Sequence, residues 1–348
     1  MIATTRSFNH QFIDPRFDDP MDLVGWMGAI QAQNYSMAKW AIGSRLQSGS
    51  LNSVNEAIRK GSILRTHILR PTWHFISAED IRWMLKLSGS RIRKAYESFA
   101  RNLNISEKEY MIYNNTIIKL LEGNKSFTRQ EICEELNKKG IKINDAHARY
   151  YIIRAETDGI LCSGEDKNGK PSYALLDERV PVSHSFDYEE ALGILAKKYF
   201  KSHSPASLED FVWWSGLTTT DAKKAIDIIK NDLTKIHTET EDMYVYHSNN
   251  CKQTSCEYLH LLPSYDELLI GYKSRTPVLE EKHYSKAFNR FGIFYPVILL
   301  NGKIIGNWNK SVRKNKIEID VALFDPEIKI SDELLNKARH RYIDFINK

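Results

Sequence analysis

The chain has 348 residues, a length that predicts two to four domains rather than a single core. Its hydrophobic fraction of 42% and charged fraction of 27% are typical of folded proteins, which excludes a disordered or collagen-like chain. The longest apolar run, at 293–300, is too short for a transmembrane helix, and polar residues interrupt the first segment where a signal peptide would be apolar. We therefore expect a cytoplasmic protein without a membrane partner.

The four cysteines are few and scattered, as is typical of a reducing compartment without structural disulfides. They are Cys133, Cys162, Cys251 and Cys256. Cys251 and Cys256 lie between His247 and His260, but no second close pair accompanies their C-x4-C spacing. The sequence therefore predicts neither a metal site nor a cofactor.

The net charge is only +5, from 49 basic and 44 acidic residues, so the distribution of charge is more informative than the total. Three stretches, at 59–70, 81–101 and 302–316, carry several basic residues and together only one acid, Glu97. A surface that follows phosphates needs such basic patches. Solvated lysines that cluster by chance are the alternative interpretation of each patch.

Helices followed by a two-stranded hairpin form the first predicted unit. Amphipathic patterns predict helices at 21–31, 36–47 and 53–60 and strands at 63–66 and 69–76. A serine followed three residues later by a carboxylate predicts helix starts at Ser77 and Ser106. We expect the resulting helices to span 77–87 and 106–122, with a further helix at 89–101 between them.

Two later units repeat the order helix, helix, hairpin. In the second unit we expect helices at 128–139 and from Asp145, then strands at 159–162 and 172–176 around an Asn168-Gly169 turn flanked by Lys167 and Lys170. In the third we expect helices at 205–214 and from Thr219 or Thr220 to 230, then strands at 233–238 and 243–247. Thr128 with Glu131, and Ser207 with Asp210, give the same helix-start signal as Ser106. This order is typical of a winged helix, so the sequence predicts a tandem array.

Strands dominate the last part of the chain. Apolar or alternating runs predict strands at 258–262, 292–300, 303–308 and 317–323, with a tight turn at Asn301-Gly302 and a final helix at 332–346. We expect an α+β fold with winged helices at 1–104, 105–180 and 187–250 and a small, mainly antiparallel β-domain at 256–348.

Gln31 and Gln33 lie two residues apart between two amphipathic runs. Positions i and i+2 of a helix point roughly 200° apart, so these side chains converge only if the chain leaves the helix at Ala32 or becomes extended there. A glutamine offers one acceptor and one donor group and does not titrate near neutrality. Two converging glutamines can therefore orient a water molecule, whereas two surface amides at a helix end are the alternative.

Four segments of the chain resemble, in order, motifs of the AlkZ/YcaQ group of bacterial winged-helix DNA glycosylases. They are AIQAQ at 29–33, LRPTWH at 69–74, DFVWWSGL at 210–217 and LPSYDELLIGYK at 262–273. The resemblance extends over nearly the whole chain and implies three winged helices and a C-terminal β-barrel arranged around duplex DNA. It also implies that Gln31 and Gln33 form an AlkZ-type catalytic Gln-x-Gln motif, where the YcaQ type has aspartate second. Pro71 departs from the glycine expected there, which puts the local hairpin in doubt.

The resemblance implies a monofunctional enzyme that removes N7-alkylated purines, bulky or crosslinked adducts included, from duplex DNA. An N7-alkylguanine is cationic and already a good leaving group, so the enzyme needs to position a water and stabilise an oxocarbenium-like transition state. We expect Gln31 and Gln33 to hold that water and the rate to lack a bell-shaped pH profile. An acidic limb that disappears in Asp266→Asn would instead assign the chemistry to Asp266.

The predicted DNA contacts lie on the wings and in the last motif. They are Arg65, Arg70, Thr72 and His74 on the first wing, Lys167 and Lys170 on the second, and Lys273 and Arg275 in the last motif. For the first four, phosphate contact and structural packing are equal alternatives, and we expect Trp73, Trp213 and Trp214 to be core residues. Asp266 and Glu267 are candidate acids, with a salt bridge to Lys273 or Arg275 as the alternative.

Other functions are compatible with parts of the pattern. A non-catalytic regulator could use winged helices in the major groove, although no dimerisation helix is evident and we expect a monomer. A metal-dependent nuclease would need a ligand cluster that the sequence does not show. The expected partner is double-stranded DNA with alkylated bases, which corresponds to a nucleoid-associated location.

Overall fold

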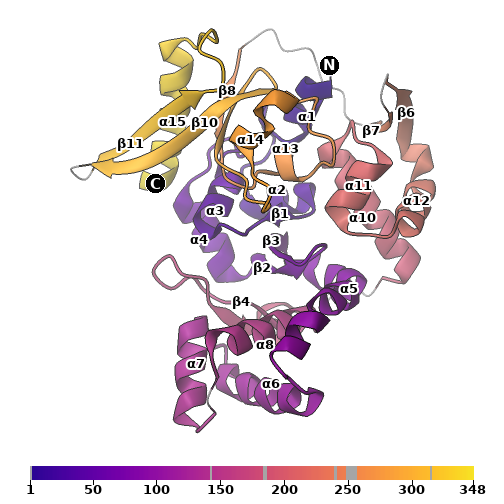
Figure 1. Cartoon of the computed structure of the whole chain (residues 1–348), viewed down its shortest axis with the longest axis vertical. Coiled ribbons are helices and arrows are strands. Elements are labelled where there is room, and N and C mark those ends of the chain that lie inside the picture. The colour runs from indigo at the N-terminus through magenta and orange to yellow at the C-terminus, as the bar shows by residue number, and fades with distance from the viewer. Residues whose placement is uncertain (1, 142, 183–185, 239–240, 248–256, 314–315) are drawn as a thin grey trace. The chain divides into compact units, whose positions relative to one another are not determined.

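The computed structural model describes residues 2–141, 143–182, 186–238, 241–247, 257–313 and 316–348. They form two compact units (Figure 1). The two-segment unit comprises Met1–Val54 and Leu192–Lys348, and the central unit comprises Asn55–Ala191. The winged-helix boundaries expected at 104, 180 and 250 stay predictions. No helix within the described ranges is both long and apolar enough to cross a bilayer.

The central unit begins in α4 (Leu51–Lys60) and continues in an antiparallel hairpin of β2 (Ile63–Ile68) and β3 (Thr72–Ser77). Its register pairs Ile63 with Ser77 and Ile68 with Thr72, so residues 69–71 form the turn. Pro71 lies in that turn, outside the ladder, and its missing N–H removes no strand-to-strand bond. The hairpin that Pro71 put in doubt is therefore present.

A single helix, α5 (Ile81–Asn102), replaces the two that were predicted at 77–87 and 89–101. The expected break is absent: the helix runs through Ser88 and Gly89, and the Ser88 hydroxyl is satisfied within the helix by the Met84 carbonyl of the preceding turn at 2.7 Å. The helix start predicted at Ser77 is wrong, because Ser77 is the last residue of β3 and Asp80 is the N-cap residue of α5. Ser77 instead donates its hydroxyl to the Asp80 carboxylate at 2.7 Å.

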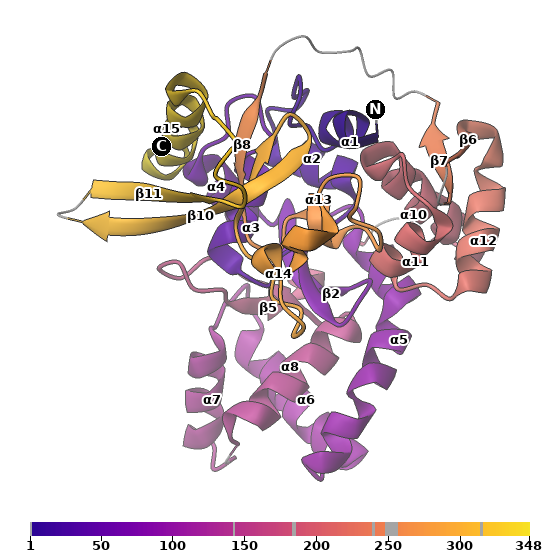
Figure 2. The same cartoon turned by 45° about the horizontal axis from the view of Figure 1, so that its top comes forward.

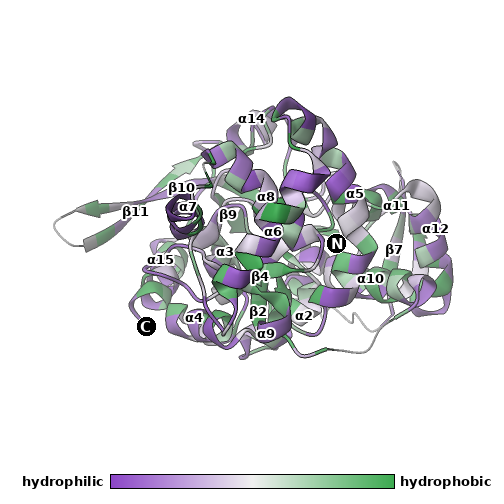
Figure 3. Cartoon of the chain, turned by 90° about the horizontal axis from the view of Figure 1, so that it is seen from below, coloured by the Kyte–Doolittle hydropathy of each residue, from purple (hydrophilic) through white to green (hydrophobic). Residues whose placement is uncertain are grey.

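Three further helices, a short hairpin and a one-turn helix complete the central unit. They are α6 (Glu107–Leu121), α7 (Arg129–Lys138) and α8 (Asp145–Thr157), followed by β4 (Leu161–Ser163), β5 (Tyr173–Leu175) and α9 (Leu176–Arg179). Capping boxes at Ser106 and Thr128 begin α6 and α7 as predicted. Asn168 and Gly169 both have positive φ, at 54° and 78°, which confirms the predicted turn. In Figure 3, α6 and α8 show alternating hydrophobic and hydrophilic bands, as expected for helices with one face in a core.

The two-segment unit starts with α1 (Ile2–Asn9), α2 (Pro20–Met27), β1 (Ile30–Gln31) and α3 (Tyr35–Gly43). The chain returns to it through α10 (Tyr188–His203), α11 (Leu208–Ser215), α12 (Thr219–Ile228), the short 3-10 turn η1 (Lys230–Asp232) and a hairpin of β6 (Leu233–His237) and β7 (Asp242–Tyr246). A capping box of Ser207 and Asp210 begins α11 as predicted. Thr218, rather than Thr219 or Thr220, caps α12 through its side chain.

An antiparallel sheet with strand order β11-β10-β9-β8 forms the last part of this unit. Its strands are β8 (Leu259–Leu262), β9 (Val297–Leu300), β10 (Lys303–Arg313) and β11 (Lys316–Leu323). Asn301 and Gly302 make the predicted turn with positive φ. The antiparallel sheet is as expected, but within the described residues it is open, because β8 and β11 are edge strands that a closed barrel would pair. Figure 2 shows the β10–β11 hairpin extending past the other two strands.

Short helices connect these strands and a long helix closes the unit. They are α13 (Glu267–Ile270), the 3-10 turn η2 (Glu281–His283), α14 (Tyr284–Ala287) and the predicted final helix, α15 (Asp332–Asn347). Trp40 of α3 donates its indole N–H to the Leu261 carbonyl at 2.7 Å, and its ring packs against Tyr342 and Phe345 of α15. The N-terminal helices and the C-terminal sheet therefore share one core.

Candidate active site

The segment that carries the two glutamines is not helical. Gly28, with φ of 77°, ends α2 after Met27, so the helix predicted at 21–31 is four residues too long. Ile30 and Gln31 are extended as β1, and Gln33 lies in a bend before α3. Gln31 is 4% exposed and Gln33 is exposed. The chain thus leaves the helix before Ala32, the condition under which the two side chains can face one side; their convergence stays a prediction.

The carboxylate of Glu267 holds this segment. Its Oε1 accepts the backbone N–H of Gln31 at 2.7 Å, and its Oε2 accepts the indole N–H of Trp214 at 3.2 Å. His203 Nε2 lies 3.7 Å from Oε2, and both side chains have no exposed surface. These partners differ from Lys273 and Arg275, which the sequence suggested as the alternative for Glu267, because tertiary packing brings β1 and α11 to this carboxylate.

Asp266 also has a different partner from the one expected. Its Oδ1 lies 2.8 Å from Nη2 of Arg45, and neither side chain is exposed. The same oxygen accepts the N–H of Leu268 at 2.9 Å and caps α13. Arg45 also donates to the Ala41 carbonyl at 2.8 Å. This bonding favours a structural role for Asp266, which ties the start of α13 to the end of α3.

A buried polar cluster continues from this point. Nε2 of His10 lies 2.9 Å from the hydroxyl of Tyr272, which donates to the carbonyl of His203 at 2.8 Å. Burial, His203 and the nearby arginines lower the pKa of His10 well below its usual value. Burial also lowers the pKa of His203, although the carboxylate of Glu267 acts in the opposite direction. Both imidazoles are therefore neutral at pH 7.

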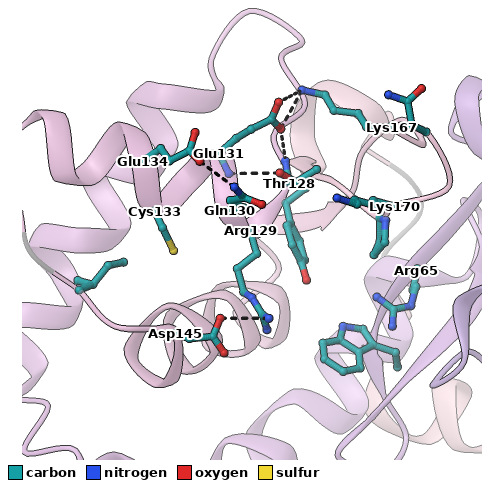
Figure 4. A pocket seen from close by; sticks show the side chains of 15 residues that line it. Arg65, Thr128, Arg129, Gln130, Glu131, Cys133, Glu134, Asp145, Lys167 and Lys170 are labelled. Carbon is teal, nitrogen blue, oxygen red and sulfur yellow. Dashed lines mark hydrogen bonds and ion pairs between the residues drawn. The ribbon is translucent and has the colours of Figure 1, made fainter.

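Three of the predicted DNA contacts line one hollow in the central unit, with a volume of about 880 Å³ (Figure 4). They are Arg65, Lys167 and Lys170, and α7 adds Arg129. The guanidinium of Arg65 lies 4.4 Å from the ring centre of Trp73, and Lys167 Nζ is 3.0 Å from Glu131. Lys170 is exposed. The structure therefore brings part of the two predicted wings together around a hollow with several cations.

Arg129 is a residue of this hollow that the sequence analysis missed. It is the first residue of α7 and lies 3.1 Å from the Asp145 carboxylate at the start of α8. A basic side chain at a helix N-terminus is unfavourable because it opposes the helix dipole. The position of Arg129 in the first turn of α7 was therefore a sequence signal for a role other than helix stabilisation.

The other predicted contacts of the first wing are less open. His74 has no exposed surface and its Nδ1 lies 3.0 Å from the Thr72 carbonyl, while Arg70 and Thr72 are half-buried. Arg65 is only 6% exposed. For His74 and Arg65, burial favours structural packing of the side chain over phosphate contact.

Lys273 and Arg275 differ in how far their side chains are exposed to solvent. The ammonium of Lys273 lies 5.3 Å from the ring centre of Trp213, which is 37% exposed and thus less buried than expected. Arg275 is 9% exposed and donates to the carbonyls of Leu269 at 2.9 Å and Lys273 at 3.2 Å. These bonds organise the loop after α13. Lys273 is the better candidate for a DNA contact.

No group of three His, Cys, Asp or Glu side chains is placed to hold a metal ion in the part of the chain that the structure describes. Cys251 and Cys256, which the sequence analysis considered as a weak metal motif, lie outside the described residues.

Comparison with known proteins identifies the class of enzyme. The chain matches the family model "DNA glycosylase AlkZ-like" over residues 24–345, and it is therefore a DNA glycosylase. It belongs to the AlkZ-like family, as the four motifs predicted, and DNA is its substrate. The alternative of a non-catalytic regulator is thereby set aside.

Two further comparisons agree with this assignment. The interstrand DNA cross-link repair glycosylase of Streptomyces sahachiroi is 23% identical over 313 residues, which cover 86% of this chain and 84% of that protein. The solved structure of Streptomyces sahachiroi DNA glycosylase AlkZ superposes with a TM-score of 0.80 at 19% identity, over 99% of this chain and 96% of the other. The mixed α+β fold is thus similar to that of AlkZ.

Proposed function

We propose that the protein is a monofunctional glycosylase that hydrolyses the N-glycosidic bond of N7-alkylated purines in duplex DNA, with water positioned by Gln31 and Gln33. The observation that carries this proposal is the extended β1 segment, whose backbone is held by a buried carboxylate at Gln31. A backbone held in this way presents side chains with little motion, which is what positioning a small nucleophile requires.

The proposed chemistry needs no titrating group. The alkylated purine carries a positive charge and leaves as a neutral base when the bond to C1′ breaks, and the sugar becomes oxocarbenium-like. Water then adds to C1′ and loses one proton to solvent, which leaves an abasic site. Amide oxygens of Gln31 and Gln33 would accept hydrogen bonds from this water, stabilising the charge that develops on it. Positioning of this kind suffices for a bond weakened by alkylation and not for an undamaged nucleoside.

The rest of the chain supports a duplex substrate. Residues of α7, α8, β4 and β5 have the order helix, helix, hairpin, as do those of α11, α12, β6 and β7, and we propose that these are the second and third winged helices. The basic hollow would contact phosphates through Arg129, Lys167 and Lys170, while the more buried Arg65 packs against Trp73 in its wall. Because the Streptomyces relative is named for interstrand cross-link repair, we include bulky and crosslinked adducts among the proposed substrates.

A single-turnover assay tests the proposal. A duplex with one N7-methylguanine is incubated with excess protein, and the released base is quantified by mass spectrometry. We expect Gln31→Ala and Gln33→Ala each to slow release about 100-fold or more without weakening duplex binding, since a transition-state interaction is removed. Gln47→Ala, an exposed glutamine of the same unit, is the matched control and should release base at the wild-type rate. Undiminished release in both active-site variants would refute the assignment.

A further inference from the structure

Glu267 is a buried acid placed where three segments of the two-segment unit meet. It is 1% exposed, and its oxygens accept hydrogen bonds from the backbone of β1 and the indole of α11. His203 of α10 is the third neighbour, at 3.7 Å. A carboxylate is costly to bury, so a site that retains one must satisfy both of its oxygens.

The position of Glu267 is itself fixed from the preceding residue. Asp266 is joined to Arg45 at 2.8 Å and caps α13, so the backbone that carries Glu267 is anchored to the end of α3. On the other side, Trp214 packs beneath the chain that enters β1, because a Cβ at Gly28 would lie 3.4 Å from the Trp214 ring. The Glu267 carboxylate, which accepts the N–H of Gln31, is therefore held in a fixed position.

The two oxygens of Glu267 accept from two different N–H donors, the Gln31 backbone and the Trp214 indole. Only a group with two acceptors satisfies both of them. A glutamine at this position offers one carbonyl oxygen and one NH2, so its NH2 must face either the Gln31 amide or the Trp214 indole. Glu267→Gln is therefore nearly isosteric and yet incompatible with one of the two hydrogen bonds.

We propose that Glu267 is a positioning residue for base release: it fixes the backbone of Gln31, and through it the direction of the Gln31 side chain. This inference rests on the proposed function of Gln31 and Gln33. Glu267 does not touch the substrate in this role and transfers no proton. Its carboxylate acts through the orientation of a neighbour, so its effect must disappear when the Gln31 side chain is absent.

That dependence defines the experiment. Single-turnover release from the N7-methylguanine duplex is measured for wild type, Glu267→Gln, Gln31→Ala and the double variant, together with duplex affinity and the thermal midpoint. We expect Glu267→Gln to slow release 10- to 100-fold with duplex affinity changed less than twofold. In the Gln31→Ala background, the same change should slow release less than threefold.

A second variant covers the case in which Glu267→Gln does not fold. Glu267→Gln combined with Trp214→Phe removes the opposed indole donor, so the new amide can turn its oxygen toward Gln31. Release by this double variant should then be within about threefold of Trp214→Phe alone, whereas a further loss of tenfold or more would overturn the positioning role.

The outcomes distinguish failure of the positioning role of Glu267 from failure of the proposed function. If the losses from Glu267→Gln and Gln31→Ala multiply, Glu267 acts independently of Gln31 and the positioning role is wrong. If Glu267→Gln releases base at the wild-type rate while Gln31→Ala does not, the inference fails and the proposed function stands. If neither Gln31→Ala nor Gln33→Ala slows release, the proposed function itself fails.

Discussion

Arg45 and Asp266 form an ion pair with 2.8 Å between Nη2 and Oδ1, and neither side chain has any exposed surface. The pair connects residues that are 221 positions apart in the sequence, one in the turn just after α3 and the other the N-cap of α13. Because Glu267 follows directly, this bond also sets the position of the carboxylate that holds Gln31.

Removing one member of this buried ion pair should strongly destabilise the folded protein. Asp266→Ala leaves the Arg45 charge buried without its partner, so we expect the free energy of unfolding to fall by about 3–5 kcal/mol. Glu56→Ala is the control: Glu56 and Arg59 are also paired, but 40% and 57% exposed, and its loss should cost about 0–1 kcal/mol. Urea denaturation compares the two, and similar losses would contradict the structural role of the buried pair.

Gly43 is a position where α15 leaves no room for a side chain. A Cβ there would lie 2.2 Å from Cε2 of Phe345, so we expect Gly43→Ala to lower the free energy of unfolding by about 1–3 kcal/mol. Gly25→Ala, in helix α2 with no atom within 4 Å of the new Cβ, should instead be neutral or stabilising. Thermal denaturation would show the difference. The companion change Phe345→Leu should recover part of the Gly43→Ala loss; a double variant as unstable as the sum of both changes would show that this contact is not responsible.

His260 predicts an acid sensitivity with a definite direction. Burial and the nearby Arg341 lower its pKa to about 3, while its Nε2 lies 2.9 Å from the Phe12 carbonyl. Below about pH 6.5 the unfolded chain protonates this histidine and the folded chain does not, so the unfolded state binds more protons. Stability is therefore full above about pH 6.5 and is lost as the pH falls toward 3, by up to about 1.4 kcal/mol per pH unit for this group.

The measurement is the free energy of unfolding between pH 7 and pH 4.5. His260→Gln should flatten its dependence on pH, whereas His340→Gln, at an exposed position, should leave the dependence as in wild type. An unchanged slope in His260→Gln would mean that other groups account for the acid sensitivity, the buried His10 and His203 being the first to examine.

Lys170 should contribute to DNA affinity through charge alone. It is exposed at the hairpin tip beside the basic hollow, whereas Lys167 is already 3.0 Å from Glu131. We expect Lys170→Ala to weaken binding to any duplex sequence and to reduce the slope of log affinity against log salt by about 1. Lys230→Ala, which removes an exposed lysine paired with Asp227, is the control. If both variants keep the wild-type salt slope, the hollow is not part of the DNA interface.

Features with a local cause were predictable from the sequence. The capping boxes at Ser106, Thr128 and Ser207 and the turns at Asn168-Gly169 and Asn301-Gly302 occur where they were expected. Each depends on residues within a few positions of one another, so its physical cause can be read in a short window. The family could be recognised from motifs for a related reason, since several short patterns in one order are specific together.

The partners of buried charged residues could not be predicted from short stretches of the sequence. Lys273 and Arg275 were the nearest cations to Asp266 and Glu267 in sequence, yet Arg45, Trp214 and the Gln31 backbone are the partners. The end of α2 at Gly28 and the continuity of α5 through Ser88 also differ from the periodic pattern. A short stretch of sequence shows which groups would need a partner if they were buried. The partners themselves lie 53, 221 and 236 residues away and meet these groups only when the core packs.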